Sequence, residues 1–362
     1  CRRVAHLRED ELIDVDLEWF PAKSPQVCSL DQIFWGRVLR VDKSHAFISL
    51  SKSTIGLLPL EHPFPNLTEG QAILVQVKRE PIPDKGTKEK GPLLTRKVTF
   101  GGRYCLFHPF HKKRLISSKV HDPAIRNRLH NLIPSDEPFT LRESASRALP
   151  DQIVSEMALL REKFIQIEPL ADKAPCITPY DSLPSSHRWM RDLDASEGNK
   201  ILVDSDQALK DIRHFLKIHR PDLMEYVTKH KGSLFKDFGL EDFWDSLFED
   251  VVALPSSGNI VIDITAAAIV IDVNQGDKDS RGTNLEAIPV IVKQLKGRHI
   301  GGNIIIDFMG IETTFQERNQ LKDQLLKEAD NLNLPLDVFG WSKLGWMEAR
   351  LPKRRLPLWD KL

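Results

Sequence analysis

Two aspartates, Asp272 and Asp307, each lie near the end of a short apolar run, AIVIDVN at 268–274 and NIIIDFMG at 303–310. The segment between the runs has helical spacing, so a strand, a helix and a second strand predict a βαβ unit with parallel strands. Both aspartates then lie at the same edge of the sheet, together with Asn274. We expect these runs to be buried on both faces, where an ionised side chain has no structural use, which favours a ligand site at this edge. The pair of carboxylates suits Mg²⁺, with Mn²⁺ as the alternative, whereas either aspartate alone is more typical of a strand end.

The helix between the runs has recognisable start and stop signals. Thr283 and Glu286 have the spacing of a capping box, and Gly297 is expected near the end of the helix. Pro289 lies past the first turn, so we expect a bend near Leu285.

The composition predicts a multidomain globular protein without a global charge. The chain has 362 residues, which predicts two to four domains, and 51 basic residues balance 51 acidic ones. Any site for nucleic acid must therefore be a local basic patch. Three segments are candidates, although such runs are most often solvated surfaces: 76–97, 111–119 and 350–362.

The four cysteines are widely separated and include no C-x-x-C pair, so no zinc site is evident and no disulfide framework is predicted. A reducing, cytoplasmic location is the simpler interpretation. No apolar stretch reaches transmembrane length and no secretory signal is present, so no membrane partner is expected. A first residue of Cys instead of Met indicates that the true N-terminus is missing or processed.

Residues 31–105 contain several short strands separated by turns, which predicts a small barrel of the OB-fold type. Such barrels bind single-stranded nucleic acid through aromatic stacking and basic groups. Phe47 is a candidate for stacking, and a core position is equally compatible with its pattern. Lys90 lies among Gly and Pro residues, which indicates an exposed loop suited to phosphate contact.

The remainder of the chain is mainly helical. Residues 148–167 predict an amphipathic helix that begins after Pro150, with its apolar side chains in a core. A Pro-rich connector at 168–187 follows, and then a strand at 200–204 and a helix at 208–219.

The segment 272–312 resembles the bacterial ribonuclease E/G endoribonucleases. It contains the D-[IV]-N, T-N-L-E-A and G-G-x-I-[IV]-I-D-F blocks of that family in order. SSGNIVID at 256–263 and WSKLGWMEARL at 341–351 are similar to the flanking segments. The resemblance extends through 90–109 and 36–50 nearly to the N-terminus, and it is weakest at 106–245.

This resemblance implies an α/β multidomain architecture. An RNase H-like subdomain is interrupted by the OB-fold barrel and by a 5′-sensor region, and a DNase I-like catalytic subdomain follows. The implied segments are 1–30 and 173–247 for the RNase H-like parts, 31–105 for the barrel, 106–172 for the sensor-like region and 248–362 for the catalytic subdomain.

The resemblance also implies a function. It is a Mg²⁺-dependent endoribonuclease that cleaves single-stranded RNA to 5′-phosphate and 3′-hydroxyl ends, in RNA processing or decay, including rRNA processing; a homo-oligomer is compatible with it. Asp272 and Asp307 match the metal-binding aspartates, and Asn274 matches the amide that contacts the scissile phosphate. The implied RNA-binding residues are Arg37, Phe47, Lys90 and Arg142, the last near the arginine that grips a 5′-monophosphate.

Four positions depart from the family pattern. Ala266 and Gly310 replace acids, which predicts the loss of carboxylates near the metal site. Leu57 replaces an aromatic residue. Glu143 replaces the threonine after the sensor arginine, and its carboxylate is expected to repel a 5′-phosphate. The cysteines of the family's zinc link do not occur after Arg350.

Two other functions compete with the endoribonuclease. A non-catalytic or weakly catalytic RNA-binding protein of the same origin is favoured by these departures, whereas the two adjacent acids favour the enzyme. A phosphodiesterase acting on DNA rests on fold class alone.

Overall fold

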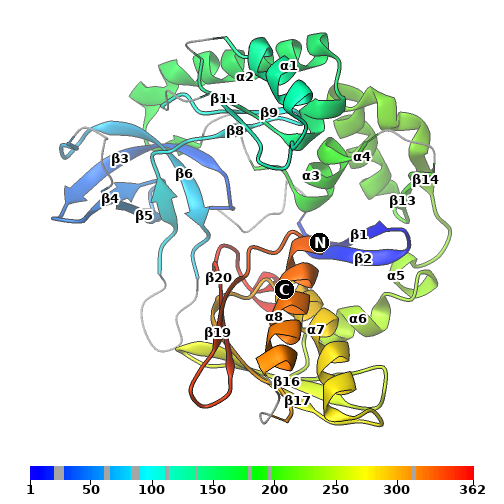
Figure 1. Cartoon of the computed structure of the whole chain (residues 1–362). Coiled ribbons are helices and arrows are strands. Elements are labelled where there is room, and N and C mark those ends of the chain that lie inside the picture. The colour runs from blue at the N-terminus through cyan, green and yellow to red at the C-terminus, as the bar shows by residue number, and fades with distance from the viewer. Residues whose placement is uncertain are drawn as a thin grey trace. The chain divides into compact units, whose positions relative to one another are not determined.

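The structure is a computed structural model that describes residues 1–19, 28–60, 66–82, 90–110, 114–134, 137–177, 182–194, 198–310 and 315–362. The chain forms two compact units (Figure 1). Unit 1 consists of Cys1–Lys23 and Ser196–Leu362, and unit 2 is the intervening segment Ser24–Ala195. The fold is therefore mixed α/β, with one unit inserted into the sequence of the other.

Unit 1 contains a six-stranded sheet with the order β15-β16-β17-β18-β20-β19. Its strands are β15 (Val251–Ala253), β16 (Asn259–Ile264), β17 (Ala268–Asn274), β18 (Gly302–Asp307), β19 (Asp337–Trp341) and β20 (Met347–Leu351). Strands β17 and β18 are parallel and are joined by helix α7 (Ser280–Gly297), whereas the other neighbouring strands are antiparallel. The predicted βαβ unit is confirmed.

Helices α7 and α8 (Phe315–Asn331) pack on one face of this sheet. The core contains alternate side chains of the strands, such as Ile271, together with Ile288 of α7 and Leu325 of α8. Asp272 and Asp307 belong to the opposite, open face. The expectation that both runs are buried on both faces is wrong, because their side chains alternate between a covered face and an open one.

Helix α7 begins earlier than predicted. The carboxylate of Asp279 accepts a hydrogen bond from the Gly282 N–H at 2.7 Å and caps the helix. Thr283 is a fully buried residue inside the first turns, so the predicted capping box is wrong. The N–H groups at the helix start are satisfied by Asp279 instead. The helix is continuous through Pro289.

The rest of unit 1 joins the N-terminal hairpin to later parts of the chain. Its elements are β1 (Arg2–Arg8), β2 (Glu11–Glu18), β13 (Ile201–Val203), α4 (Asp206–His219), η4 (Pro221–Tyr226), β14 (Val227–Lys229), α5 (Leu234–Asp237), α6 (Glu241–Ser246) and η5 (Leu358–Lys361). Strands β1 and β2 are antiparallel, and β13 and β14 form a separate parallel pair. The predicted strand at 200–204 and helix at 208–219 are confirmed as β13 and α4.

A hydrophobic cluster fixes the hairpin in unit 1. It contains Val15, Leu17, Phe235, Trp244, Leu247 and Leu358. Between the two strand residues of this cluster, the buried Asp16 lies 2.7 Å from the Nζ of Lys361. Burial alone raises the pKa of Asp16, but His299, Lys361 and Arg355 together hold it far below its usual range. The hairpin is thus held by apolar contacts and by a buried ion pair with the C-terminal segment.

Unit 2 contains the predicted barrel. Strands β3 (Ile33–Val41), β4 (His45–Ser49), β5 (Ile55–Pro59), β7 (Leu93–Thr95) and β6 (Ala72–Arg79) are paired in that order, and β3 pairs with β6 to close the ring. Strand β12 (Cys176–Ile177) adds to β3. The interior is formed by buried aliphatic side chains and Phe34.

The second part of unit 2 is a four-stranded sheet with helices. Its strands are β8 (Phe100–Gly101), β9 (Cys105–Phe107), β10 (Leu115–Ile116) and β11 (Phe139–Leu141), and its helices are α1 (Pro123–Leu132), η2 (Glu143–Arg147), α2 (Pro150–Ile167), η3 (Glu168–Lys173) and α3 (Ser185–Asp192). Helix α2 confirms the predicted amphipathic helix, with Ile153, Met157 and Leu160 buried in the core. Residues 93–101 are shared between the two sheets of unit 2, since β7 belongs to the barrel and β8 to this sheet.

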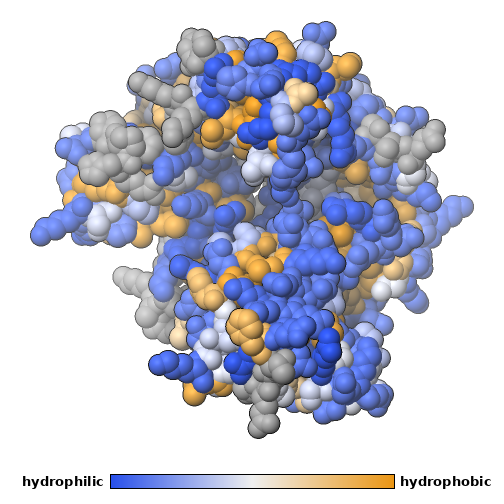
Figure 2. Space-filling model, viewed as in Figure 1, coloured by the Kyte–Doolittle hydropathy of each residue, from blue (hydrophilic) through white to orange (hydrophobic). Residues whose placement is uncertain are grey.

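The face of the molecule in Figure 2 is mainly hydrophilic, with hydrophobic residues in small patches. Within the described ranges, no helix has both the length and the apolar character needed to span a bilayer. The five-segment division and the RNase H-like layout remain predictions.

Candidate active site

Asp272 and Asp307 are direct neighbours on the open face of the unit 1 sheet. In the parallel pairing of β17 with β18, Asp272 is the partner of Asp307. Paired residues of neighbouring strands point to the same face, and the strands are about 4.8 Å apart. The structure thus brings together the two carboxylates that the sequence placed at one edge, and neither makes an ion pair with a described residue.

Asn274 lies two residues beyond Asp272 and therefore on the same face. Its Nδ2 donates to the Asp272 Oδ2 at 3.1 Å and to the Asn259 Oδ1 at 3.2 Å. Asn259 is the partner of Asn274 on the adjacent strand β16. Sequence reasoning missed Asn259, although it lies in the SSGNIVID segment. The Asn274 amide thereby orients the Asp272 carboxylate without adding charge.

Two residues of the T-N-L-E-A block fix the backbone after β18 and before β16. Asn284 is fully buried, and its amide donates to the Met309 carbonyl at 2.8 Å and accepts from the Met309 N–H at 3.0 Å. Glu286 accepts from the backbone N–H of Ser256 at 2.8 Å. The first contact fixes the backbone two residues after Asp307, and the second fixes the turn before β16. Both residues belong to the block noted in the sequence, where Glu286 was interpreted as part of a capping box and Asn284 was given no role.

The loop after Asn274 returns closely against the same turn. A Cβ atom built on Gly276 lies 1.9 Å from the Ser256 carbonyl oxygen. This distance is too short for any residue that has a Cβ. This close approach requires glycine and brings the loop beside the strand ends.

Ala266 does not lie near the two aspartates. It is exposed in the turn between β16 and β17, at the opposite end of β17 from Asp272. The four residue-to-residue steps from Ala268 to Asp272 alone span roughly 13 Å of extended strand. The expectation that Ala266 removes a carboxylate beside the metal site is therefore wrong. Gly310 is nearer to the site and has a left-handed φ of 67°, which glycine adopts without strain.

The donor set of this face is compatible with Mg²⁺. Among the described residues, no group of three or more His, Cys, Asp or Glu side chains is arranged to hold a metal ion. Mg²⁺ commonly uses one or two carboxylates and completes its shell with water and substrate phosphate. Asp272 and Asp307 match that requirement, whereas a structural zinc site needs more protein ligands.

The barrel residues differ in how their side chains are used. Phe47 alternates with the buried Ala46 and Ile48, so it faces outward, and the Arg40 guanidinium lies 4.5 Å from its ring centroid. This resolves the ambiguity about Phe47 against a core position. Arg40, which sequence reasoning missed, extends the aromatic surface with a cation. Leu57 is the partner of Phe47 on β5.

The other two basic candidates of the barrel have different environments. The Arg37 guanidinium donates to the Ala174 carbonyl at 2.9 Å and to the Gly70 carbonyl at 2.8 Å, which holds two backbone segments together. Lys90 is exposed, and its backbone forms an isolated antiparallel bridge with Ile82; residues 83–89 lie outside the described ranges.

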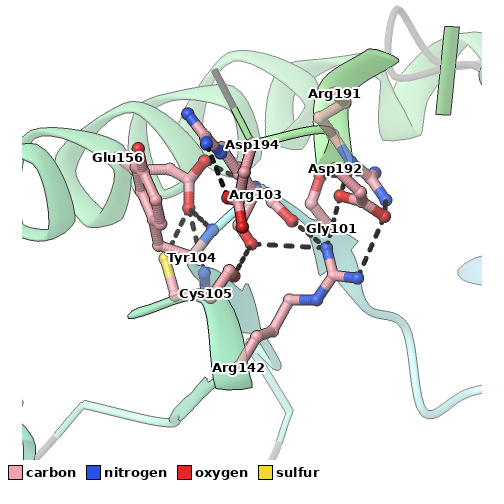
Figure 3. Close-up of polar contacts among 11 residues, drawn as sticks. Gly101, Arg103, Tyr104, Cys105, Arg142, Glu156, Arg191, Asp192 and Asp194 are labelled. Atoms are coloured by element: carbon pink, nitrogen blue, oxygen red, sulfur yellow. Dashed lines mark hydrogen bonds and ion pairs between the residues drawn. The ribbon is translucent and has the colours of Figure 1, made fainter. Parts of the chain in front are cut away.

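Arg142 is already paired with a carboxylate of its own unit (Figure 3). Its Nη1 and Nη2 donate to the two oxygens of Asp192 at 2.8 and 3.0 Å, and Nη1 also donates to the Gly102 carbonyl. Burial raises the pKa of Asp192, but hydrogen bonds from Arg191 and Arg142 outweigh it and hold that pKa below its usual value. The bidentate pair occupies the fork that would grip a phosphate. Glu143 is exposed beside it.

A second carboxylate organises the same region. Glu156 of α2 accepts hydrogen bonds from the backbone N–H groups of Arg103, Tyr104 and Cys105. A Cβ on Gly102 would lie 2.4 Å from the Glu156 carboxylate carbon, so a larger residue there would displace this carboxylate. The backbone at 103–105, which lies beside Arg142, is therefore held by the Glu156 carboxylate.

Comparison with known proteins assigns the chain to a family. The sequence profile of the Ribonuclease E/G family matches residues 99–353. Ribonuclease E of Haemophilus influenzae is 28% identical over 89% of this chain and 37% of that protein. Ribonuclease G of the same organism is 26% identical over 79% of this chain and 60% of that protein. Ribonuclease E of a Nostoc species is 30% identical over 71% of this chain and 39% of that protein.

The chain spans 37% to 60% of the length of these relatives. The family profile covers more than half of the chain and includes both aspartates of the open face, their connecting helix α7 and the Arg142 region. The chain belongs to the ribonuclease E/G family.

Proposed function

We propose that this chain is a Mg²⁺-dependent endoribonuclease that cleaves single-stranded RNA and leaves 5′-phosphate and 3′-hydroxyl ends, in RNA processing or decay. The observation that carries the proposal is the register that pairs Asp272 with Asp307 on an open sheet face. Two like charges side by side repel each other, and neither forms an ion pair with a described residue. Such an arrangement favours a bound divalent cation and, beside it, a phosphate.

The residues of the face have distinct roles in this proposal. Asp272 and Asp307 hold the ion, which when bound lowers the pKa of a coordinated water and stabilises charge on the reacting phosphate. Both donors of the Asn274 amide are engaged, one by Asp272 and one by Asn259. Contact with the scissile phosphate therefore requires release of one of these bonds. Releasing the bond to Asp272 also frees that carboxylate for the ion.

RNA binding is assigned mainly to the barrel. The outward ring of Phe47 can stack on a base, which is worth ~1–3 kcal/mol in such sites, and Arg40 beside it adds a cation. Lys90 supplies positive charge at an exposed position. Arg37 was expected to contact RNA, but its hydrogen bonds to two carbonyl groups favour a structural role.

The alternative is a non-catalytic or weakly catalytic RNA-binding protein. It is favoured by the small donor set, since no group of three or more His, Cys, Asp or Glu side chains among the described residues is arranged to hold a metal ion. A labelled single-stranded RNA incubated with Mg²⁺ or with a chelator separates the two. Cleavage that needs Mg²⁺ and yields fragments ligatable at their 3′ ends supports the enzyme. Binding without cleavage at any Mg²⁺ concentration establishes the alternative.

A further inference from the structure

A tight loop joins β19 to β20, and Trp346 lies directly before the first residue of β20. The Ser342 N–H donates to the Trp346 carbonyl at 2.8 Å, and Gly345 has a φ of 90°. Three-residue hairpin loops with glycine at this position commonly form a bulge at the glycine, after which the alternation of the strand resumes. Trp346 therefore follows the alternation of β20.

That alternation puts Trp346 on the open face. Met347 and Ala349 are buried in the core, whereas Glu348 and Arg350 are exposed on the other side. Trp346, one residue before Met347, has the same parity as the exposed residues.

The strand register places Trp346 beside the paired aspartates. Met347 is the partner of Ile306 across the antiparallel pair β18 and β20. The next position in that register sets Trp346 opposite Asp307, whose partner on β17 is Asp272. Directly opposed side chains have Cβ atoms about 4.5–5.5 Å apart. An aromatic residue thus continues the row formed by the two carboxylates.

Trp346 differs from the other tryptophan of the hairpin. Trp341 packs against the core beside Phe308, and its Nε1 donates to the Arg318 carbonyl. Trp346 is only partly buried and is not part of that core, and its indole N–H has no acceptor among the described residues. A large aromatic ring in this position contributes little to the core and remains available to a ligand.

We propose that Trp346 stacks on the nucleobase next to the scissile phosphate and thereby determines which nucleotides are held over the aspartates. This inference rests on the proposed endoribonuclease function and deepens it. A phosphate bound at Asp272 and Asp307 carries its adjoining base within reach of the next position of the sheet. Because an aromatic ring can stack on every base, the preference of the protein for the nucleotide beside the cleaved bond follows stacking strength. Purines, which have the larger rings, are therefore favoured.

The test combines protein variants with modified RNA. A single-stranded RNA with one cleavage site is prepared intact and with single abasic nucleotides, and kcat/KM is measured in Mg²⁺. We expect one abasic position adjoining the cleaved bond to slow the wild-type protein about tenfold, the size of one lost stacking contact. Trp346→Ala should lose about tenfold on intact RNA, with no further loss at that abasic position, and Trp346→Phe should recover most of the activity.

Leu344→Ala is the matched control, because Leu344 is 67% exposed in the same loop. It should behave as the wild-type protein. Equal abasic effects in wild type and Trp346→Ala, or no abasic effect in the wild type, overturn the inference alone. Absence of cleavage by the wild-type protein overturns the proposed function and this inference with it.

Discussion

The charged side chains of the open face in unit 1 lack ion-pair partners among the described residues, whereas Arg142 in unit 2 has one. On the open face, Asp272 and Asp307 lie side by side and make no ion pair with a described residue. In unit 2, Arg142 is matched by both oxygens of Asp192 at hydrogen-bonding distance. One region presents charge that needs a ligand, and the other has satisfied its charge internally.

This difference bears on which family features the chain retains. Unpaired like charges are costly unless a cation binds, so their presence favours a working metal site. A saturated arginine must break a bidentate pair before it can bind phosphate, which reduces the net gain. This contrast supports the proposed metal-dependent chemistry and predicts weak discrimination between RNA 5′ ends.

Removal of one charge of the open face should have the largest effect. Asp272→Asn and Asp307→Asn should each lower the cleavage rate by about 10²–10³-fold or more, the size expected when one group that stabilises transition-state charge is lost. RNA affinity and thermal stability should change little. Cleavage rates, filter binding and melting curves measure these effects. Asp263→Asn is the control, since Asp263 lies on the neighbouring strand β16 and is exposed on the same face of the sheet as Asp272. Wild-type cleavage by either variant would remove both aspartates from the mechanism.

A smaller effect is expected when Asp307 is displaced instead of removed. Asn284→Ala leaves the Met309 N–H and carbonyl without their partners, which should cost about 1–3 kcal/mol of stability for a buried group. We expect kcat to fall about 10–100-fold, as for groups that orient metal ligands, with RNA affinity unchanged. Asn303→Ala is the control, because Asn303 is exposed near the start of β18, the strand that ends with Asp307. An unchanged kcat in a destabilised Asn284→Ala protein would limit Asn284 to folding.

The 5′-end comparison should give a more moderate effect. The wild-type protein should cleave RNA with a 5′-monophosphate and RNA with a 5′-hydroxyl at similar rates. Asp192→Asn removes the negative charge that pairs with Arg142. This variant should cleave the 5′-monophosphate RNA about tenfold faster than the 5′-hydroxyl RNA, which is the scale of a charged hydrogen bond. Glu143→Thr tests the neighbouring acid separately. A strong monophosphate preference in the wild-type protein would show that the Arg142–Asp192 pair opens readily.

The smallest effects are expected in the barrel. Lys90→Ala should weaken binding to all single-stranded sequences alike and reduce the slope of log K against log salt by about 0.7. Phe47→Ala should weaken binding by ~1–3 kcal/mol with little change in slope. Arg37→Ala should lower the melting temperature, because it removes contacts to two carbonyl groups. If none of the three variants changes RNA binding, the RNA site lies outside the barrel.

The sequence could predict the adjacency of the aspartates because the information is local. Two apolar runs joined by one helix require parallel strands, and the similar place of each acid in its run aligns the pair. The pairing of Arg142 with Asp192 spans 50 residues and a connector without periodic pattern, so no local signal indicated it. The contacts of Arg37 with backbone carbonyls were equally hidden, since any residue supplies a carbonyl. The helix start was misassigned because both Asp279 and Thr283 are good capping residues.

The hairpin of β1 and β2 has a consequence for the order in which the protein is made. Asp16 and its partner Lys361 are 345 positions apart, and Val15 and Leu17 share a cluster with Leu358. At synthesis rates of roughly 5–20 residues per second, the hairpin waits on the order of half a minute for these partners. The buried residues that form the two cores of unit 2 lie between Cys28 and Ile167, so all of them are synthesised within that interval. Unit 2 can therefore fold while the chain is still emerging, and β1 and β2, although made before unit 2, reach their final packing after it.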